Sequence, residues 1–135
     1  MFQHVSNGMT YTAPAISQRA ALRALSLREE IAEEYISVYR ERVFALSDRL
    51  AALPFLTLLR PRGTFYLFPG IAKTGLTDGE FCRKLLEEAH ILVSPGSAFG
   101  AAGRGHFRIA ATVPTEKLME AADRLARLHI CKEDA

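Results

Sequence analysis

An arginine in an apolar stretch stands just after a glycine-rich segment. Residues 95–105 read PGSAFGAAGRG, and Arg108 follows between Phe107 and Ile109. If this stretch is a β-strand, alternation points Arg108 away from the face that Phe107 and Ile109 use. A guanidinium beside a closely approaching backbone can bind a carboxylate through two parallel hydrogen bonds. A lone arginine of this kind is more often a solvated surface charge, so the residues by themselves leave both interpretations open.

The glycines of the same segment suggest a second kind of chemistry. Gly100, Gly103 and Gly105 could cradle a phosphate if they joined a strand to the N-terminus of a helix, where free backbone amides face the ligand. Here another strand candidate follows instead of a helix. The order of elements therefore favours a tight surface turn or a loop beside a substrate over a nucleotide site.

The spacing of cysteine and histidine does not indicate a metal site. Cys82 and Cys131 are far apart, and none of the four histidines pairs with a cysteine at the spacing of zinc ligands. We therefore expect no metal, and reduced thiols in a cytoplasmic protein.

The charge balance excludes two classes of partner. Seventeen basic residues against fifteen acidic ones give a formal net charge of +2, and the basic residues are scattered along the chain. A surface that binds nucleic acid would concentrate them on one face. No apolar run approaches the length of a membrane span. We expect neither a nucleic-acid nor a membrane partner.

The elements that must position Arg108 are four helices and several short strands. The predicted helices cover residues 14–25, 26–53, 77–89 and 114–130. The predicted strands are two short antiparallel strands around residues 61–63 and single strands at 91–94 and 106–113. This order indicates an α+β fold of the α/β family, with a small antiparallel or mixed sheet of about four strands and helices packed on one face.

Two capping patterns mark helix starts within this order. Ser26 and Glu29, and again Thr77 and Glu80, have the spacing of a capping box. After the first pattern, apolar residues recur at three- and four-residue steps, which predicts a long amphipathic helix.

Several motifs occur together along nearly the whole chain. They are QRAA at residues 18–21, PRGTFY at 61–66, LLEEAHILVSPGSAFG at 85–100, Gly103, and RIA at 108–110, with Tyr39 and Arg42 on the long helix. In this order and spacing the sequence resembles the class I and II aminotransferases, of the fold type I family that depends on pyridoxal phosphate, and in particular their small C-terminal domain. Each motif alone is weak, whereas the set is specific.

The resemblance implies a substrate, a cofactor and a role for Arg108. In such enzymes the arginine that aligns with Arg108 holds the α-carboxylate of the amino-acid substrate, while an amino group passes between an amino acid and a 2-oxo acid. A fixed carboxylate orients the Cα–H bond against the ring of pyridoxal 5'-phosphate. The family forms dimers, so a homodimer is possible, in which residues 11–14 would lean toward the partner subunit's active site.

For the other residues of the motifs we expect structural roles. Phe65 and Tyr66 should pack a hairpin on the long helix rather than contact substrate. Pro95, Phe99 and the glycines beside them should shape the loop. Arg108 is thus the single predicted site residue, with no catalytic, cofactor-binding or metal-binding residue beside it.

The chain departs from the family pattern in one respect. Residues 1–25 resemble the end of the family's large domain and residues 26–135 the small domain, so we expect the rest of the large domain, with its Schiff-base lysine, to be missing. None of the four lysines, at positions 73, 84, 117 and 132, stands in the serine-rich strand-end setting where the family places its cofactor lysine, so we expect them to have ordinary surface roles. We therefore expect no covalently bound cofactor and an inactive fragment. The alternatives are a non-catalytic module that binds carboxylates or proteins, and self-association through the helix at 14–25.

Overall fold

The computed structural model describes residues 13–130 of the chain, in two compact units that meet between Ile36 and Ser37. The predicted loop at residues 11–14 lies partly outside the described residues, and Cys131 lies wholly outside them. The predicted domain boundary between residues 25 and 26 stays a prediction, because a division by compactness does not show where a large domain would end.

The first unit is helical and buries almost none of its side chains. Helix α2 (Ala15–Ser26) follows Pro14 and has no buried residue. A helix in this place was predicted from its Ala-, Leu- and Arg-rich sequence, and the prediction is confirmed. Helix α3 (Arg28–Ala51) begins two residues after α2 ends and continues into the second unit.

The predicted capping box at Ser26 and Glu29 is wrong. Ser26 is the last residue of α2, and its hydroxyl donates a hydrogen bond backwards to the Arg23 carbonyl at 2.8 Å. The amide of Leu27 donates to the same carbonyl, and the amide of Ile31 donates to the Leu27 carbonyl. The helical hydrogen bonds thus almost continue through the junction, so no free helix start is left for Ser26 to cap.

Helix α3 is amphipathic over its C-terminal half only. Its buried residues are Val43, Leu46, Ser47 and Leu50. The apolar residues of its first turns, such as Ile31 and Tyr35, are exposed although they continue the same spacing. Periodicity along the sequence identified the helix but not the point at which its apolar face becomes covered.

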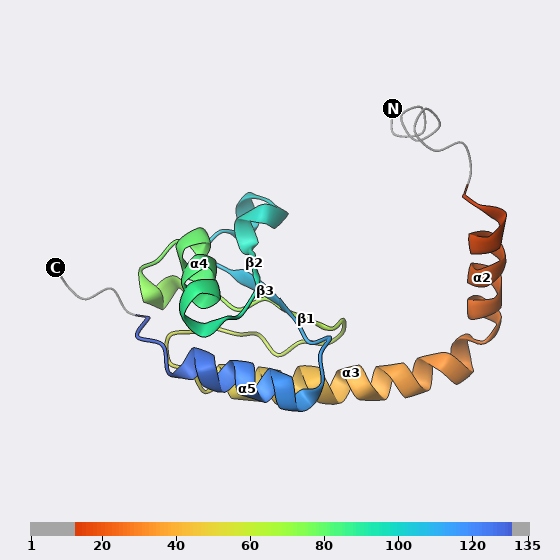
Figure 1. The fold of residues 1–135 in the computed structure, drawn as a ribbon, viewed down its shortest axis with the longest axis horizontal. Coiled ribbons are helices and arrows are strands. Elements are labelled where there is room, and N and C mark those ends of the chain that lie inside the picture. The colour runs from red at the N-terminus through yellow and green to blue at the C-terminus, as the bar shows by residue number, and fades with distance from the viewer. Residues whose placement is uncertain (1–12, 131–135) are drawn as a thin grey trace. The chain divides into compact units, whose positions relative to one another are not determined.

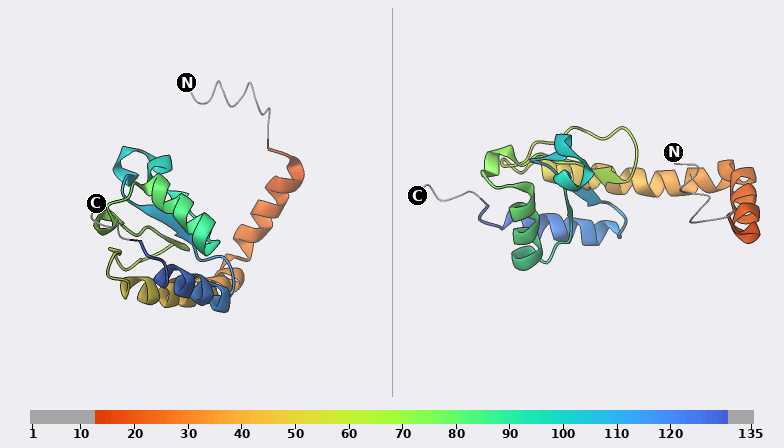
Figure 2. Two further views of the ribbon diagram at one scale, coloured as in Figure 1. Left: turned by 60° about the vertical axis from the view of Figure 1, so that its left-hand side comes forward. Right: turned by 90° about the horizontal axis from the view of Figure 1, so that it is seen from above.

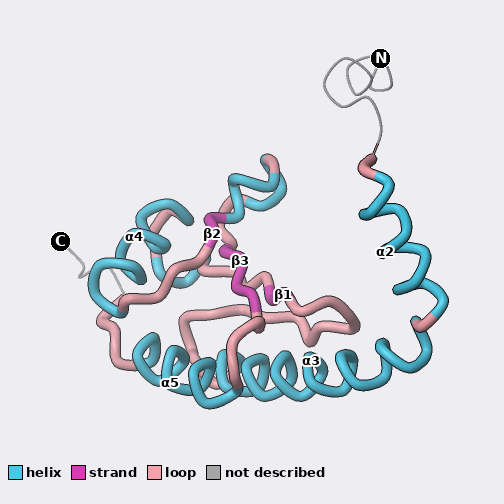
Figure 3. Tube along the Cα trace, turned by 45° about the vertical axis from the view of Figure 1, so that its right-hand side comes forward, coloured by secondary structure: helices cyan, strands magenta, loops and turns pink. Residues whose placement is uncertain are grey.

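The second unit contains a small antiparallel sheet (Figures 1 and 3). Strands β1 (Tyr66–Leu67), β2 (Ser94–Pro95) and β3 (Phe107–Ala110) form three strands in the order β1-β3-β2, where about four were predicted. Tyr66 pairs with Ala110, and Ser94 pairs with Arg108. The antiparallel arrangement agrees with the prediction, and the strand number is corrected to three within residues 13–130.

The missing strand is explained by the segment around Gly63. The predicted hairpin there does not form, because β1 pairs with β3 instead. Thr57 exchanges two backbone hydrogen bonds with Gly70, of 2.9 and 2.7 Å, so the two arms of the segment meet only at this isolated bridge. The positive φ of 62° falls on Thr64 and not on Gly63. The segment is therefore a wide loop.

Helices α4 (Asp78–Ala89) and α5 (Thr115–Ala126) complete the second unit. The predicted capping box of α4 is confirmed: Glu80 donates its amide to the Thr77 hydroxyl at 3.2 Å, and the Thr77 amide donates to the Glu80 carboxylate at 2.9 Å. Helix α5 runs along the C-terminal half of α3 (Figures 1 and 2), where Arg49 and Asp123 form an ion pair.

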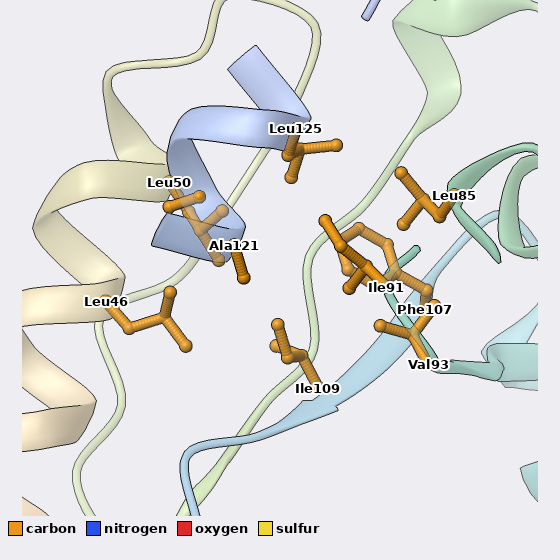
Figure 4. A pocket seen from close by; sticks show the side chains of 10 residues that line it. Leu46, Leu50, Leu85, Ile91, Val93, Phe107, Ile109, Ala121 and Leu125 are labelled. Atoms are coloured by element: carbon orange, nitrogen blue, oxygen red, sulfur yellow. The ribbon is translucent and has the colours of Figure 1, made fainter. Parts of the chain in front are cut away.

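The core lies between these helices and one face of the sheet. Phe107, Leu46, Leu50 and Phe81 are fully buried in it. Figure 4 shows side chains from α3, α4, β3 and α5 pointing toward a common centre, where a cavity of about 10 Å³ remains. Its lining is wholly apolar, so it should stay dry. The three helices therefore pack on one face of the sheet, as predicted, and the opposite face is left for other contacts.

Candidate functional site

Arg108 lies on the sheet face that the helices leave uncovered. Its neighbours on β3, Phe107 and Ile109, line the core cavity, so alternation along the strand directs Arg108 to the other side. The arginine is half-buried and sits on the middle strand, opposite Ser94 of β2. The strand therefore presents Arg108 from the most constrained position of the sheet.

Aromatic rings surround the guanidinium. Its central carbon lies 4.4 Å from the ring centroid of Tyr66 and 4.3 Å from that of Phe99. Phe68 makes an edge contact with Phe99 at 6.3 Å and stacks on His106 at 5.3 Å between centroids. We call Tyr66, Phe68, Phe99 and His106 the aromatic cluster.

The guanidinium has no acidic partner in the described part of the chain. Within residues 13–130, no carboxylate forms an ion pair with Arg108. Aromatic faces attract a cation but accept none of its conventional hydrogen bonds, and an arginine carries five N–H donors in one plane. The arrangement can therefore bind a planar anion such as a carboxylate through two N–H groups.

The glycine-rich loop before β3 folds into two short turns of 3₁₀ helix, Gly96–Phe99 and Ala101–Gly103. Gly96 and Gly103 touch backbone to backbone: a Cβ on either would come within 2.0 Å of the carbonyl oxygen of the other. Glycine is required at both positions for this approach. The loop agrees with the predicted close-approach turn, and it precedes a strand rather than a phosphate-binding helix.

A buried carboxylate fastens this loop to α4. The Ser97 amide donates to Asp78 Oδ2 at 2.8 Å, and Asp78 is only 7% exposed. Hydrogen bonds from the Ser97 hydroxyl and amide lower the pKa of Asp78 below its ordinary value. Sequence reasoning had not singled out Asp78. The thiol of Cys82, one turn further along α4, has its pKa raised to about 11, first by burial and then by the charge of Asp78.

Comparison with known sequences identifies the family. The profile of the family described as "Aminotransferase class I and II" matches residues 2–125. The chain belongs to the class I and II aminotransferases.

Individual members support this assignment. The chain is 42% identical over 113 residues to the LL-diaminopimelate aminotransferase of Aquifex aeolicus, a match that covers 84% of this chain and 29% of that protein. It resembles the crystal structure of an aromatic aminotransferase from Pyrococcus horikoshii, with a TM-score of 0.70 and 42% identity over 73% of this chain and 26% of the other. A mutant aspartate aminotransferase from Thermus thermophilus gives a TM-score of 0.80 at 33% identity, over 92% of this chain and 34% of the other.

The chain spans about 29% of the length of such aminotransferases. The members of the family that it resembles are named for diaminopimelate, aromatic and aspartate substrates. Similarity therefore places the chain in the family without selecting one substrate. The activity and substrates of a whole aminotransferase are therefore not assigned to this chain by similarity alone.

Aminotransferases of this family use pyridoxal phosphate, so the lysines of the chain bear on whether it could hold that group. Lys73 donates to the Pro54 carbonyl at 3.0 Å, and Lys84 and Lys117 form ion pairs with glutamates on their own helices. A Schiff-base lysine must present a neutral amine in a pocket. These three amines are engaged in contacts at the surface rather than presented in a pocket, so they do not fit the cofactor. Lys132 lies outside the described residues.

Metal-binding clusters and membrane-spanning helices are both absent from residues 13–130. Residues 13–130 contain no cluster of three or more His, Cys, Asp or Glu side chains that could hold a metal ion. Within the same range, no helix combines the length and apolar composition that crossing a membrane requires.

The structure differs from the sequence analysis most at Tyr66 and Phe99. Both were expected to have packing or loop-shaping roles, and both have their rings against Arg108. Phe65 does pack against Tyr39 of α3, at 5.5 Å between centroids, as expected. Alternation along β1 could have assigned Tyr66 to the face opposite Phe65, whereas the position of Phe99 depends on a loop fold that no periodicity predicts.

Proposed function

We propose that this chain forms the small C-terminal domain of a pyridoxal-phosphate-dependent aminotransferase and that Arg108 binds the substrate carboxylate there. The assembled enzyme would transfer an amino group between an amino acid and a 2-oxo acid. The observation that carries the proposal is the guanidinium of Arg108, held on the open face of the sheet without an acidic partner among residues 13–130.

The physical role of Arg108 is orientation and selection. Two-point, charge-assisted hydrogen bonds fix a carboxylate in the guanidinium plane and discriminate against neutral amines. Pyridoxal phosphate, when bound in the whole enzyme, supplies the electron sink. A carboxylate held at one end gives the rest of the substrate a defined direction, and this pre-ordering accelerates a reaction at the neighbouring carbon.

The proposal includes the organisation of the chain. Residues 1–25 would be the end of the large domain and residues 26–135 the small domain, in a cytoplasmic homodimer. The chain alone would be inactive, because the amines of Lys73, Lys84 and Lys117 are engaged at the surface.

Two measurements on the chain test these statements separately. An acetate titration followed by ¹⁵N NMR should shift the Arg108 Nε–H signal, and Arg108→Gln should abolish saturable binding. Arg49→Gln is the matched control, since Arg49 already pairs with Asp123 and should not matter. Acetate binding that survives Arg108→Gln would overturn the role of Arg108.

Absorption spectroscopy tests the expected inactivity. Adding pyridoxal phosphate should give no stable internal-aldimine band. A stable band that disappears when a single lysine is replaced would show that the chain does hold the cofactor.

A second candidate function is favoured by the exposed apolar side chains of α2. Ile16, Leu22 and Leu25 are 79%, 70% and 67% exposed. Leu22 and Leu25, three residues apart, share one face of α2, and apolar side chains gathered on an exposed face are typical of a protein-interaction surface. The chain could therefore act as a non-catalytic module that associates with itself or another protein. Sedimentation at several concentrations tests this second candidate: Leu22→Glu should lower the mass of a chain that self-associates through α2, and an unchanged mass would contradict self-association through this helix.

A further inference from the structure

Phe99 occupies a position that core packing does not explain. Its side chain is 51% exposed, yet its ring lies 4.3 Å from the central guanidinium carbon of Arg108. Burial of an apolar ring would favour a position turned inward toward the core. The ring instead faces a cation on the open side of the sheet, where a cation–π contact provides the attraction.

The backbone that carries Phe99 is fixed from two directions. Ser97, two residues earlier, is held by its hydrogen bond to the buried Asp78. Gly96 makes its close backbone contact with Gly103, and its amide donates to the His106 carbonyl at 2.8 Å. Phe99 therefore projects from a braced turn rather than from a free loop.

The two rings reach Arg108 from opposite neighbours of its strand. Tyr66 belongs to β1, on one side of β3, and Phe99 ends the 3₁₀ turn that follows β2, on the other side. Neither ring uses up an N–H group of the guanidinium, since each contact is made to the cation as a whole. The side chain can thus be held in one orientation and still donate to a carboxylate.

We propose that Phe99 is a positioning residue for Arg108, and that Asp78 maintains this position by fastening the loop. The inference rests on the proposed function of Arg108 and adds to it the means by which the guanidinium is pre-oriented. An arginine side chain has many rotamers, and a ligand that must select one of them binds more weakly. A ring that already favours the binding rotamer removes part of that cost before the ligand arrives.

The full chain, labelled with ¹³C and ¹⁵N, allows a direct test by NMR with acetate as the probe at constant ionic strength. In the wild type, the Arg108 side-chain protons should show an upfield shift from the adjacent rings. Phe99→Leu should remove much of this shift and weaken acetate binding about three- to fivefold, which corresponds to the loss of an exposed cation–π contact. Phe99→Tyr should restore both.

Phe44→Leu is the matched control, because Phe44 lies under a different arginine, Arg60, at 4.9 Å. This variant should leave the Arg108 signals and the acetate affinity unchanged. Asp78→Asn should reduce both the upfield shift of the Arg108 protons and the acetate affinity, each by less than Phe99→Leu does.

The outcomes separate the two proposals. If acetate binding depends on Arg108 but is the same in Phe99→Leu as in the wild type, the positioning role is overturned and the carboxylate site stands. A lost ring-current shift with unchanged affinity would equally overturn it. If acetate binds without regard to Arg108, the proposed function itself fails, whatever Phe99 does to the spectrum.

Discussion

The two faces of β3 are built from adjacent residues and are stabilised in different ways. Phe107 is fully buried against three helices, around a cavity that contains no polar group. Arg108, the next residue, contacts two aromatic rings and forms no ion pair within residues 13–130. We expect stability to depend mainly on the buried face and the proposed carboxylate binding on the other face, so substitutions one position apart should have separable effects.

The largest expected effect comes from the buried face. Phe107→Ala should lower the free energy of unfolding by about 3–5 kcal/mol, because it leaves a cavity among side chains that cannot fully collapse. Arg108→Ala should cost about 1 kcal/mol or less. Urea unfolding of both variants measures the difference. Equal losses would show that the open face carries as much stability as the core.

The next largest effect should come from the glycine-rich loop between β2 and β3, which carries Phe99. In Gly96→Ala the new methyl group would meet the Gly103 carbonyl oxygen at 2.0 Å, so the turn must open. We expect a loss of about 1–3 kcal/mol in thermal unfolding and a weaker contact between Phe99 and Arg108. Gly63→Ala is the control, since a Cβ there has nothing within 4 Å. A harmless Gly96→Ala would disprove the close approach.

A smaller effect should appear with pH. The pKa of Asp78 is lowered in the folded chain, so its contribution to stability is fully present above the unfolded value of about 3.9 and is lost as pH falls through the lower folded value. Asp78→Asn should cost about 1 kcal/mol at neutral pH and reduce the loss of stability in acid.

The matched variant for this pH dependence is Asp48→Asn, at an exposed position of α3. Unfolding curves collected from pH 7 down to pH 2 should separate the two. An acid limb that is identical in wild type and Asp78→Asn would show that the carboxylate does not fasten the loop.

The smallest expected effect is a gain in stability from a substitution on the buried face. Val93 lines the apolar cavity, and Val93→Ile would place one more methylene in it. Filling this space should add about 0.5 kcal/mol of stability. Val113→Ile, at a position that is 45% exposed, should change nothing measurable. A destabilised Val93→Ile would indicate that the cavity cannot accept the added group.

A local pattern was predicted correctly only where the preceding backbone leaves free amides for it to satisfy. The capping box at Thr77 and Glu80 forms because α4 begins after a loop with free amides to satisfy. The same spacing at Ser26 and Glu29 fails, because Leu27 keeps helical hydrogen bonds on both sides. The motif alone does not reveal whether the preceding residues are already helical.

Pairings between distant segments were predicted less well. Alternation correctly directed Arg108 away from Phe107, since it depends on strand geometry alone. The partner of β1 could not be found in this way: Tyr66 pairs with Ala110, and the nearby segment around Gly63 that suggested a hairpin remains a loop. The contact between Phe99 and Arg108 depends on the path of a glycine-rich turn, for which side-chain periodicity gives no information.

The strand order has a consequence for synthesis. β3 is the middle strand and the last of the three to be made, and both outer strands bond only to it. While a ribosome is still extending the chain, β1 and β2 therefore wait without a hydrogen-bonding partner until residues 107–110 emerge. A stop codon after Gly105 would remove β3 with the rest of the C-terminal sequence, and every strand pairing of the sheet would be lost.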